Sequence, residues 1–300
     1  MNRTFHVVCP ICGHNKLNPF LKTIDFTVSK EEYELLECES CGFVLTQNAP
    51  DFDHIGSYYK GEEYISHSNT KKGLFFKLYH RVREYMLKQK FNLIEQNRAN
   101  VPEPKLLEIG TGRGYFLNYM QMHGYQSIGL EQDPEVRDIA AKEFSLDIRE
   151  PNQLFKLEAK QFDVITLWHV LEHIHDFKVY LESIRQLLKS DGLLVIALPN
   201  PNAADAQFYS EYWSGWDLPI HLWHFKPKNV EMLMKQFQLE IIDRKALPFD
   251  PFYLSIISSK QKGDAIPFLK GMWNGWKAHR MAKKDFELTT SIIYLIKHQQ

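Results

Sequence analysis

The pattern of apolar and polar positions predicts a mixed α/β architecture for most of the chain. Gly73 to Asn97 carries apolar residues at helical spacing and ends before Pro102 and Pro104, which predicts one long helix. Short apolar runs between turn residues then predict buried strands. These runs cover residues 106–109, 127–131, 161–168, 192–198, 239–242 and 291–296, and a further helix is expected at 230–237.

The turn after the first of these strands combines an acidic residue with alternating glycines. Gly110, Gly112 and Gly114 follow Glu108, with Thr111 among them. Glycine permits positive φ and close approach to a ligand, and the helix that follows directs free N–H groups at the same place. The spacing differs from the G-x-G-x-x-G of dinucleotide-binding turns, and a carboxylate here suits an ammonium group. The turn therefore predicts a nucleoside-cofactor site, with an ordinary strand-to-helix turn as the plain alternative.

A second acidic residue ends the next predicted strand. Glu131 follows the glycine turn by about twenty residues, the spacing at which a carboxylate accepts hydrogen bonds from ribose hydroxyls. The strand, the glycine turn and the distal acid favour nucleotide binding more strongly together than the turn does alone.

These segments together resemble the class I S-adenosylmethionine-dependent methyltransferases. The resemblance extends from about Lys105 to Leu198, through the segment Glu108 to Gly114, Glu131, and the strands at 161–168 and 192–198. It implies a doubly wound, seven-stranded, mostly parallel Rossmann-like sheet and S-adenosylmethionine as the cofactor.

The resemblance also implies roles for single residues. Glu108 and the glycine turn (Gly110, Thr111, Gly112 and Gly114) hold the methionine part of the cofactor in such enzymes, Glu131 the ribose and Gln132 the adenine. Backbone near Trp168 closes the site. The partner of the adenine amino group stays open between Glu150 and Asn152.

All four cysteines lie near the N-terminus in two C-x-x-C-G motifs. They are Cys9, Cys12, Cys38 and Cys41. Two such motifs on tight glycine turns predict a zinc ribbon with a closed, structural four-thiolate site. Two disulfides are the alternative, which a cytoplasmic protein does not keep oxidised.

Composition and charge are those of a soluble enzyme without a broad affinity for polyanions. The 300 residues include 36 basic and 37 acidic side chains, and 44% of the chain is hydrophobic. Residues 1–48 hold four basic and six acidic side chains, so nucleic acid is an unlikely partner of the ribbon. The N-terminus lacks the apolar core of a signal peptide, and no run is long enough to cross a bilayer. We expect a cytoplasmic location, and the oligomeric state stays open.

A histidine-rich pattern follows the strand at 161–168. His169 to His173 matches the H-x-x-E-H pattern of inverted zinc proteases. The pattern directly follows a buried strand, where methyltransferases of this type commonly show a similar Leu-Glu-His stretch. His173 is therefore expected to be a structural or pocket-edge residue.

A loop dense in Trp and His follows the strand at 192–198. It runs from Trp213 to Phe225, and its Pro-x-His-x-x-x-Phe ending resembles a bacterial subset of methyltransferases that includes members with zinc ribbons. Histidine titrates near neutral pH and suits a general base for a hydroxyl or acidic carbon. His221 and His224 are the candidate bases.

These features predict three regions and one activity. The regions are a zinc ribbon at 1–48, a linker and helical cap at 49–104, and a methyltransferase domain at 105–300 with a helical insertion near 252–284. The insertion carries seven basic residues and one acid between residues 260 and 284, which makes membrane-surface contact a minor possibility beside a solvated face. The expected activity is O- or C-methylation of a small molecule such as a sugar, quinone or lipid precursor. The alternatives are a zinc-ribbon binding module for nucleic acid or protein that retains the cofactor fold, and a nucleic-acid methyltransferase.

Overall fold

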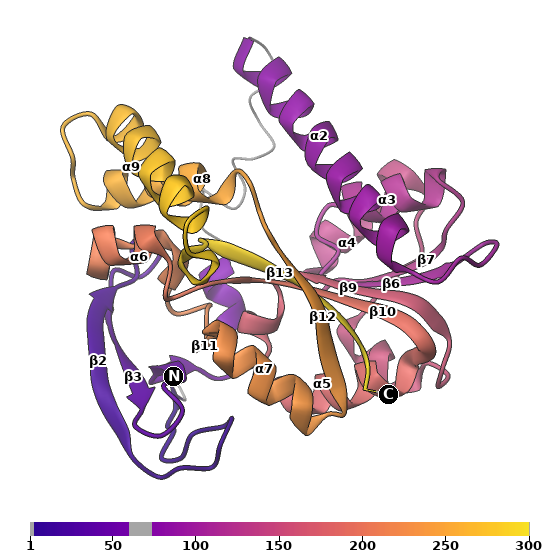
Figure 1. Ribbon diagram of the computed structural model, residues 1–300, viewed down its shortest axis with the longest axis horizontal. Helices are drawn as coiled ribbons and strands as arrows, with labels where there is room; N and C mark the ends of the chain where they lie inside the picture. The colour runs from indigo at the N-terminus through magenta and orange to yellow at the C-terminus, as the bar shows by residue number, and fades with distance from the viewer. Residues whose placement is uncertain (1–2, 60–73, 300) are drawn as a thin grey trace.

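A seven-stranded sheet forms the centre of the computed structural model, which describes residues 3–59 and 74–299 (Figure 1). Its strand order is β12-β13-β10-β9-β6-β7-β8, and β13 alone runs antiparallel to its neighbours. The strands are β6 (Lys105–Ile109), β7 (Gln126–Leu130), β8 (Ile148–Arg149), β9 (Phe162–Trp168), β10 (Leu188–Pro199), β12 (Leu239–Ala246) and β13 (Ser291–His298). The predicted doubly wound, mostly parallel sheet is confirmed.

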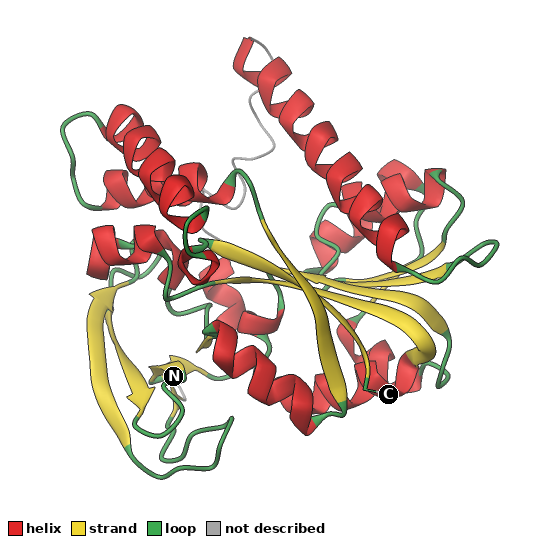
Figure 2. Ribbon diagram, viewed as in Figure 1, coloured by secondary structure: helices red, strands yellow, loops and turns green. Residues whose placement is uncertain are grey.

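Helices cover both faces of this sheet (Figure 2). Figure 1 shows α2, α3 and α4 on one face and α5 and α7 on the other. Because both faces are covered, the strands are apolar along their length, and every residue from 192 to 198 in β10 is buried. The helices are α2 (Leu74–Asn97), α3 (Tyr115–Met122), α4 (Pro134–Phe144), α5 (Phe177–Leu187) and α7 (Pro227–Gln236). The predicted long helix is confirmed as α2, whereas residues 60–73 of the predicted linker lie outside the described residues.

A second sheet joins the N-terminal segment to a strand from far along the chain. Its order is β11-β4-β3-β2, and β11 pairs with β4 in antiparallel register. The side-chain amide of Asn229 on α7 also donates to the carbonyl of Cys41 at 3.0 Å. The N-terminal segment therefore packs on the region around β11 and α7. The strands are β2 (Leu17–Ile24), β3 (Glu32–Cys38), β4 (Val44–Gln47) and β11 (Trp223–His224), beside a small pair of β1 (Arg3–Thr4) and β5 (Ala49–Pro50).

The insertion between β12 and β13 is a helical hairpin. It consists of α8 (Asp250–Gln261) and α9 (Pro267–Ala282), which pack on each other and on α6 (Ala204–Tyr209). Short 3-10 turns complete the described structure at η1 (Ile55–Tyr59), η2 (Pro151–Lys156), η3 (Leu171–His173), η4 (Ser210–Tyr212), η5 (Ser214–Trp216) and η6 (Phe286–Leu288). Within residues 3–59 and 74–299, none of the helices has the length and apolar character needed to span a bilayer.

Candidate active site

The glycine turn connects the end of β6 to the start of α3. Gly110, Gly112 and Gly114 have φ values of 75°, 54° and 76°, in the left-handed region that favours glycine. A Cβ atom at Gly112 would meet no atom within 4 Å, whereas one at Gly110 would collide with Val170. The buried hydroxyl of Thr111 donates to the carbonyl of Glu108 at 3.2 Å and braces the turn. Gly112 thus borders open space where a ligand can approach the backbone.

Glu108 is a buried carboxylate beside this turn. It is 3% exposed, and its Oε2 has no hydrogen-bond partner among the described residues. Burial raises the pKa of Glu108, and the nearby ammonium of Lys90 opposes that shift. Lys90 arrives from α2, and its Nζ lies 4.0 Å from the ring centroid of Trp168 at the end of β9. A buried carboxylate oxygen without a partner fits a cationic ligand group.

Glu131 faces the glycine turn from the end of β7. Its Oε2 accepts a hydrogen bond from the Gly112 N–H at 2.7 Å, and its Oε1 accepts one from the Asp133 N–H at 3.0 Å. Gln132 is exposed next to it, and Asn152 is exposed on η2 after β8. Since β6, β7, β8 and β9 run parallel, the predicted cofactor residues gather at the carboxyl edge of the sheet.

Glu172 and His173, which follow β9 at this edge, form a compact group with His221 from the loop before β11. One side-chain oxygen or ring nitrogen from each lies within 4.8 Å of the others. Neither carboxylate oxygen of Glu172 has a hydrogen-bond partner in the described part of the chain. The Nδ1 atoms of His173 and His221 lie 3.0 Å and 2.9 Å from the carbonyls of Ile220 and Gly215. Both Nδ1 atoms therefore carry a proton, which leaves the Nε2 atoms as acceptors.

Burial keeps these two rings uncharged. It lowers the pKa of His173 to about 4 and also lowers the pKa of His221. A neutral imidazole at pH 7 has a free lone pair and is able to accept a proton. The rings of His173 and His221 meet edge to face at 4.6 Å between centroids.

Tyr59 on η1 lies beside the histidine group. Its hydroxyl lies 3.3 Å from Nδ1 of His173. Burial and the carboxylates of Asp217, Glu172 and Glu131 raise the pKa of Tyr59, so the hydroxyl keeps its proton. Tyr59 is thus within electrostatic reach of Glu131 at the glycine turn and of Glu172 beside the histidines.

His169 is held between two carboxylates. Its Nδ1 lies 3.5 Å from Oε1 of Glu172, and its Nε2 lies 3.4 Å from Oδ2 of Asp250 on α8. Burial alone would lower the pKa of His169, but Asp250 and Glu172 raise it to about 9. His169 also has a φ of 56° and lies outside the short turn η3, which contains His173. The two histidines of the H-x-x-E-H pattern do not share a helix, as an inverted zinc-protease site requires.

The charge on His169 predicts a pH-dependent contribution to stability. Its pKa rises from 6.5 to about 9 on folding, so the stabilisation is complete below pH 6.5 and is lost as the pH rises to about 9. The ring is 35% exposed, and solvent screening reduces the expected effect to about 1 kcal/mol. The difference in the free energy of unfolding between wild type and His169→Asn should therefore fall by about 1 kcal/mol from pH 6.5 to about pH 9. Asparagine tolerates the positive φ. A flat difference would contradict the ion pairs.

His224, the second candidate base, lies against the N-terminal segment. It is 4% exposed in β11, and its Nε2 lies 3.0 Å from Oγ1 of Thr46. The Thr46 hydroxyl donates its proton to the carbonyl of His221 at 2.6 Å. Since a hydroxyl has one proton, Nε2 of His224 must donate to Thr46 and cannot accept there.

Comparison with known proteins shows the family of this chain. Residues 79–244, more than half of the chain, match the family described as a methyltransferase domain. The chain belongs to this methyltransferase family. The predicted class I family and its Rossmann-like fold are thereby confirmed.

Curated relatives of the methyltransferase chain share part of their length with it. Ubiquinone biosynthesis O-methyltransferases of Cereibacter sphaeroides and a Ruegeria species are 31% and 34% identical over 160 residues. The match covers 49% of this chain and 64% of each relative.

Solved structures share the methyltransferase fold at low identity. Phosphoethanolamine N-methyltransferase 2 of Haemonchus contortus, in complex with S-adenosyl-L-methionine, has a TM-score of 0.50 and 16% identity over 71% of this chain and 53% of that chain. Geranyl diphosphate C-methyltransferase of Streptomyces coelicolor has a TM-score of 0.51 and 11% identity over 73% and 81%.

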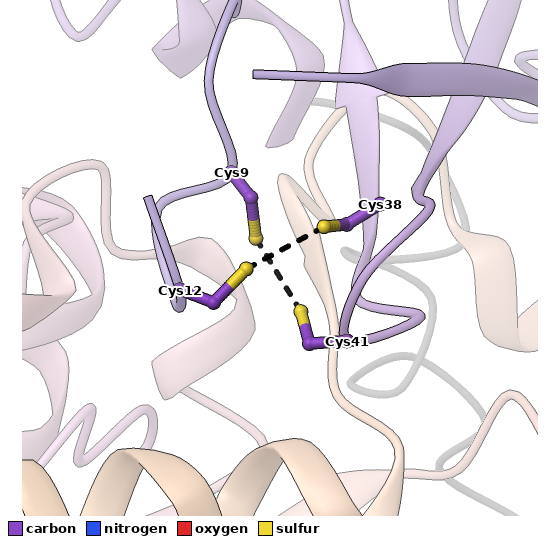
Figure 3. Close-up of side chains that lie close together, drawn as sticks. All are labelled: Cys9, Cys12, Cys38 and Cys41. Carbon is purple, nitrogen blue, oxygen red and sulfur yellow. Dashed lines mark hydrogen bonds between the residues drawn. The ribbon is translucent and has the colours of Figure 1, made fainter. Parts of the chain in front are cut away.

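The methyltransferase also brings its four cysteines together (Figure 3). Their sulfurs lie within 4.8 Å of one another, with Cys9 to Cys41 and Cys12 to Cys38 both at 3.5 Å. These distances exceed the disulfide length of about 2.05 Å and approach the separation of about 3.8 Å between thiolates around tetrahedral zinc. The cysteines are free thiols here, and their geometry is compatible with a metal ion.

Sequence reasoning missed several residues of the methyltransferase site. Lys90, Tyr59 and Asp250 were not among the candidate site residues, and Glu172 appeared only within the H-x-x-E-H pattern. The sequence gives one weak indication for Lys90, which is a charged residue on the otherwise apolar face of the predicted helix. Asp250 begins a helix 81 residues beyond His169, and nothing in the local pattern connects the two.

Proposed function

We propose that this methyltransferase transfers a methyl group from S-adenosylmethionine to a hydroxyl or an acidic carbon of a small molecule. One observation carries the proposal: the glycine turn with its two acids and the neutral histidines lie at the carboxyl edge of the same sheet. A cofactor cradle beside a potential base is the arrangement that methyl transfer to a protonated acceptor requires.

The cofactor fits the residues of the cradle. The partnerless Glu108 oxygen suits its ammonium group, and Lys90 suits its carboxylate. Glu131 suits the ribose hydroxyls, with Gln132 and Asn152 beside the adenine. The bound cofactor supplies an electrophilic methyl group on a good leaving group. The chain therefore has to align the acceptor with that methyl group, exclude water and take up one proton.

His221 is the proposed general base. Its Nδ1–H donates to the carbonyl of Gly215, so Nε2, which lies 3.9 Å from Oδ2 of Asp217, keeps its lone pair and can take the acceptor proton. The buried carboxylate of Glu172 stabilises the imidazolium that forms. His224 serves as a positioning residue, because its Nε2–H is used to hold Thr46, which in turn holds the His221 backbone.

The acceptor is proposed to carry a hydroxyl group, as the names of the ubiquinone O-methyltransferase relatives suggest. The four cysteines are proposed to hold one structural zinc ion, since four thiolates leave no open coordination position. The predicted division into ribbon, cap and methyltransferase domain remains part of this proposal.

Titration with S-adenosylhomocysteine tests the cofactor assignment without an acceptor. Glu131→Ala should weaken binding by at least about a hundredfold, because two hydrogen bonds from ribose to a charged acceptor are lost. Isothermal titration calorimetry measures this, with Glu135→Ala on the first turn of α4 as the matched control and NAD as the competing ligand. Equal affinities of wild type and Glu131→Ala, or a preference for NAD, would refute the assignment.

Paired substitutions separate the roles of the two histidines once a screen with labelled cofactor has identified an acceptor. His221→Asn keeps a donor for Gly215 and removes the base, and kcat should fall by about a hundredfold. His224→Gln keeps a donor for Thr46, so kcat should stay close to that of wild type, with any change confined to KM. Both variants should bind S-adenosylhomocysteine as wild type does. Full activity of His221→Asn would show that another group is the base.

A further inference from the structure

The α8–α9 hairpin is held together by close helix contact. Gly271 and Gly275 face α8, where a Cβ atom on Gly275 would lie 2.7 Å from Cα of Phe252, and one on Gly271 would overlap Ile256. Asn274 donates to the hydroxyl of Tyr209 on α6 at 3.0 Å. The hairpin is therefore a firmly packed unit, and Figure 1 shows it above α6.

A side of α9 that faces solvent is strongly apolar. Trp273 is 54% exposed and Trp276 is 39% exposed, with their rings stacked at 5.0 Å between centroids. Isolated exposed apolar residues are ordinary, but a cluster of large ones on one helix marks a contact surface. The cluster, here called the α9 face, consists of Ile266, Phe268, Leu269, Met272, Trp273 and Trp276.

Basic side chains border the α9 face. Lys277 Nζ lies 5.4 Å from the ring centroid of Trp273, and the Arg280 guanidinium lies 5.1 Å from that of Trp276. Between residues 260 and 284 there are seven basic residues and one acid, Asp264, which pairs with Lys270. The whole chain has a net charge of −1, so this positive charge is a local feature of the hairpin.

We propose that the α9 face docks the protein on an anionic lipid bilayer, with the apolar residues in the interfacial region and Lys277 and Arg280 on the lipid phosphates. The 16-residue helix is too short to span a bilayer and suits a position in its plane. Tryptophan and flanking basic residues are the side chains that such interfaces favour.

Two other occupants fit the charge and composition less well. A second copy in a two-fold contact would bring the same basic border against itself, which is unfavourable. A nucleic acid would satisfy the basic residues and stack on the tryptophans, but it would leave Leu269 and Met272 without apolar partners. An anionic bilayer satisfies both the aliphatic and the basic part of the surface.

The position of the hairpin connects this surface to the candidate active site. α8 begins at Asp250, whose carboxylate lies 3.4 Å from His169. Docking through the α9 face would therefore place the bilayer against the helical hairpin whose first residue, Asp250, pairs with His169. Binding itself does not depend on the proposed methyl transfer.

Vesicle co-sedimentation of the full chain tests the proposal. The protein should partition onto vesicles of phosphatidylcholine mixed with phosphatidylglycerol, and more weakly onto phosphatidylcholine alone or at high salt. Trp273→Ser/Trp276→Ser should lower the partition coefficient by at least about tenfold. Lys277→Glu/Arg280→Glu should lower it by about thirtyfold. The second pair changes only exposed charges, so it tests the surface even if the serine variant folds poorly.

Matched changes on other helices provide the controls. Met122→Ser on α3 and Lys178→Glu on α5 alter exposed residues of the same kinds and should leave partitioning unchanged. Three results would overturn the proposal: no binding of wild type to anionic vesicles, full binding of both α9 variants, or equal losses in the controls. If wild type did not bind vesicles but formed a dimer, and Trp273→Ser/Trp276→Ser made that dimer dissociate, the α9 face would be assigned to a second copy of the chain. Tight binding of duplex DNA, again without vesicle binding, would assign it to nucleic acid.

Discussion

Replacement of Gly112 by valine is expected to abolish binding of S-adenosylhomocysteine and, with it, all methyl transfer. Gly112 has a φ of 54° and borders open space, and its N–H donates to Glu131. Valine methyl groups would fill the space that a cofactor needs, and a β-branched residue strains a left-handed backbone. The affinity should fall by more than about a hundredfold, which isothermal titration calorimetry measures.

Gly124→Val is the matched control for this substitution. Gly124 has a φ of 89°, and a Cβ atom there also meets nothing within 4 Å, but it lies between α3 and β7 away from the glycine turn. Both variants carry the same kind of backbone strain, so both should lose a similar amount of thermal stability. Only Gly112→Val should lose the cofactor. Equal affinities in the two variants would show that the cofactor does not occupy the cradle.

Loss of the proposed zinc ion is expected to unfold the N-terminal sheet. Structural zinc binding contributes about 10–16 kcal/mol in small zinc domains, which exceeds the stability of most folded domains. Cys38→Ser should remove the metal and lower the thermal midpoint by about 10 °C or more. Elemental analysis should give one zinc ion per wild-type chain and none in the variant. Thermal unfolding with and without a chelator measures the stability change.

The N-terminal segment with the cysteine turns also contacts the region of the proposed base. Loss of zinc should therefore reduce turnover but not cofactor binding. β11 pairs with β4, Thr46 donates to the His221 carbonyl, and Asn229 donates to Cys41. Cys38→Ser should therefore lose turnover while it keeps its affinity for S-adenosylhomocysteine, since the glycine turn lies in the central sheet.

Ser40→Ala, between the second pair of cysteines, is the control and should retain both metal and activity. If the wild-type protein contained no zinc, and a chelator did not change its thermal midpoint, the proposed zinc site would be refuted.

The sequence alone determined the features that reside in one continuous segment. The acid and glycines from Glu108 to Gly114 form a strand end, a turn and a helix start whose geometry depends on neighbouring residues. The same is true of the two C-x-x-C-G turns, in which the Gly13 and Gly42 N–H groups donate to the Cys9 and Cys38 carbonyls. Long apolar strands were predictable because burial on both faces demands apolar residues throughout.

Tertiary structure decided which distant residues meet. The two-residue strand β11 is too short to show any periodicity, yet its pairing with β4 brings the N-terminal segment onto the Trp- and His-rich loop. Lys90 reaches Glu108 and Trp168 only because α2 packs on the sheet. The histidine pattern after β9 suggested hydrolysis in isolation, and chain folding instead sets His169 between Glu172 and Asp250. Local sequence encodes turns and strands through backbone preferences, whereas the charge and proton state of each active-site group depend on neighbours that only the folded chain supplies.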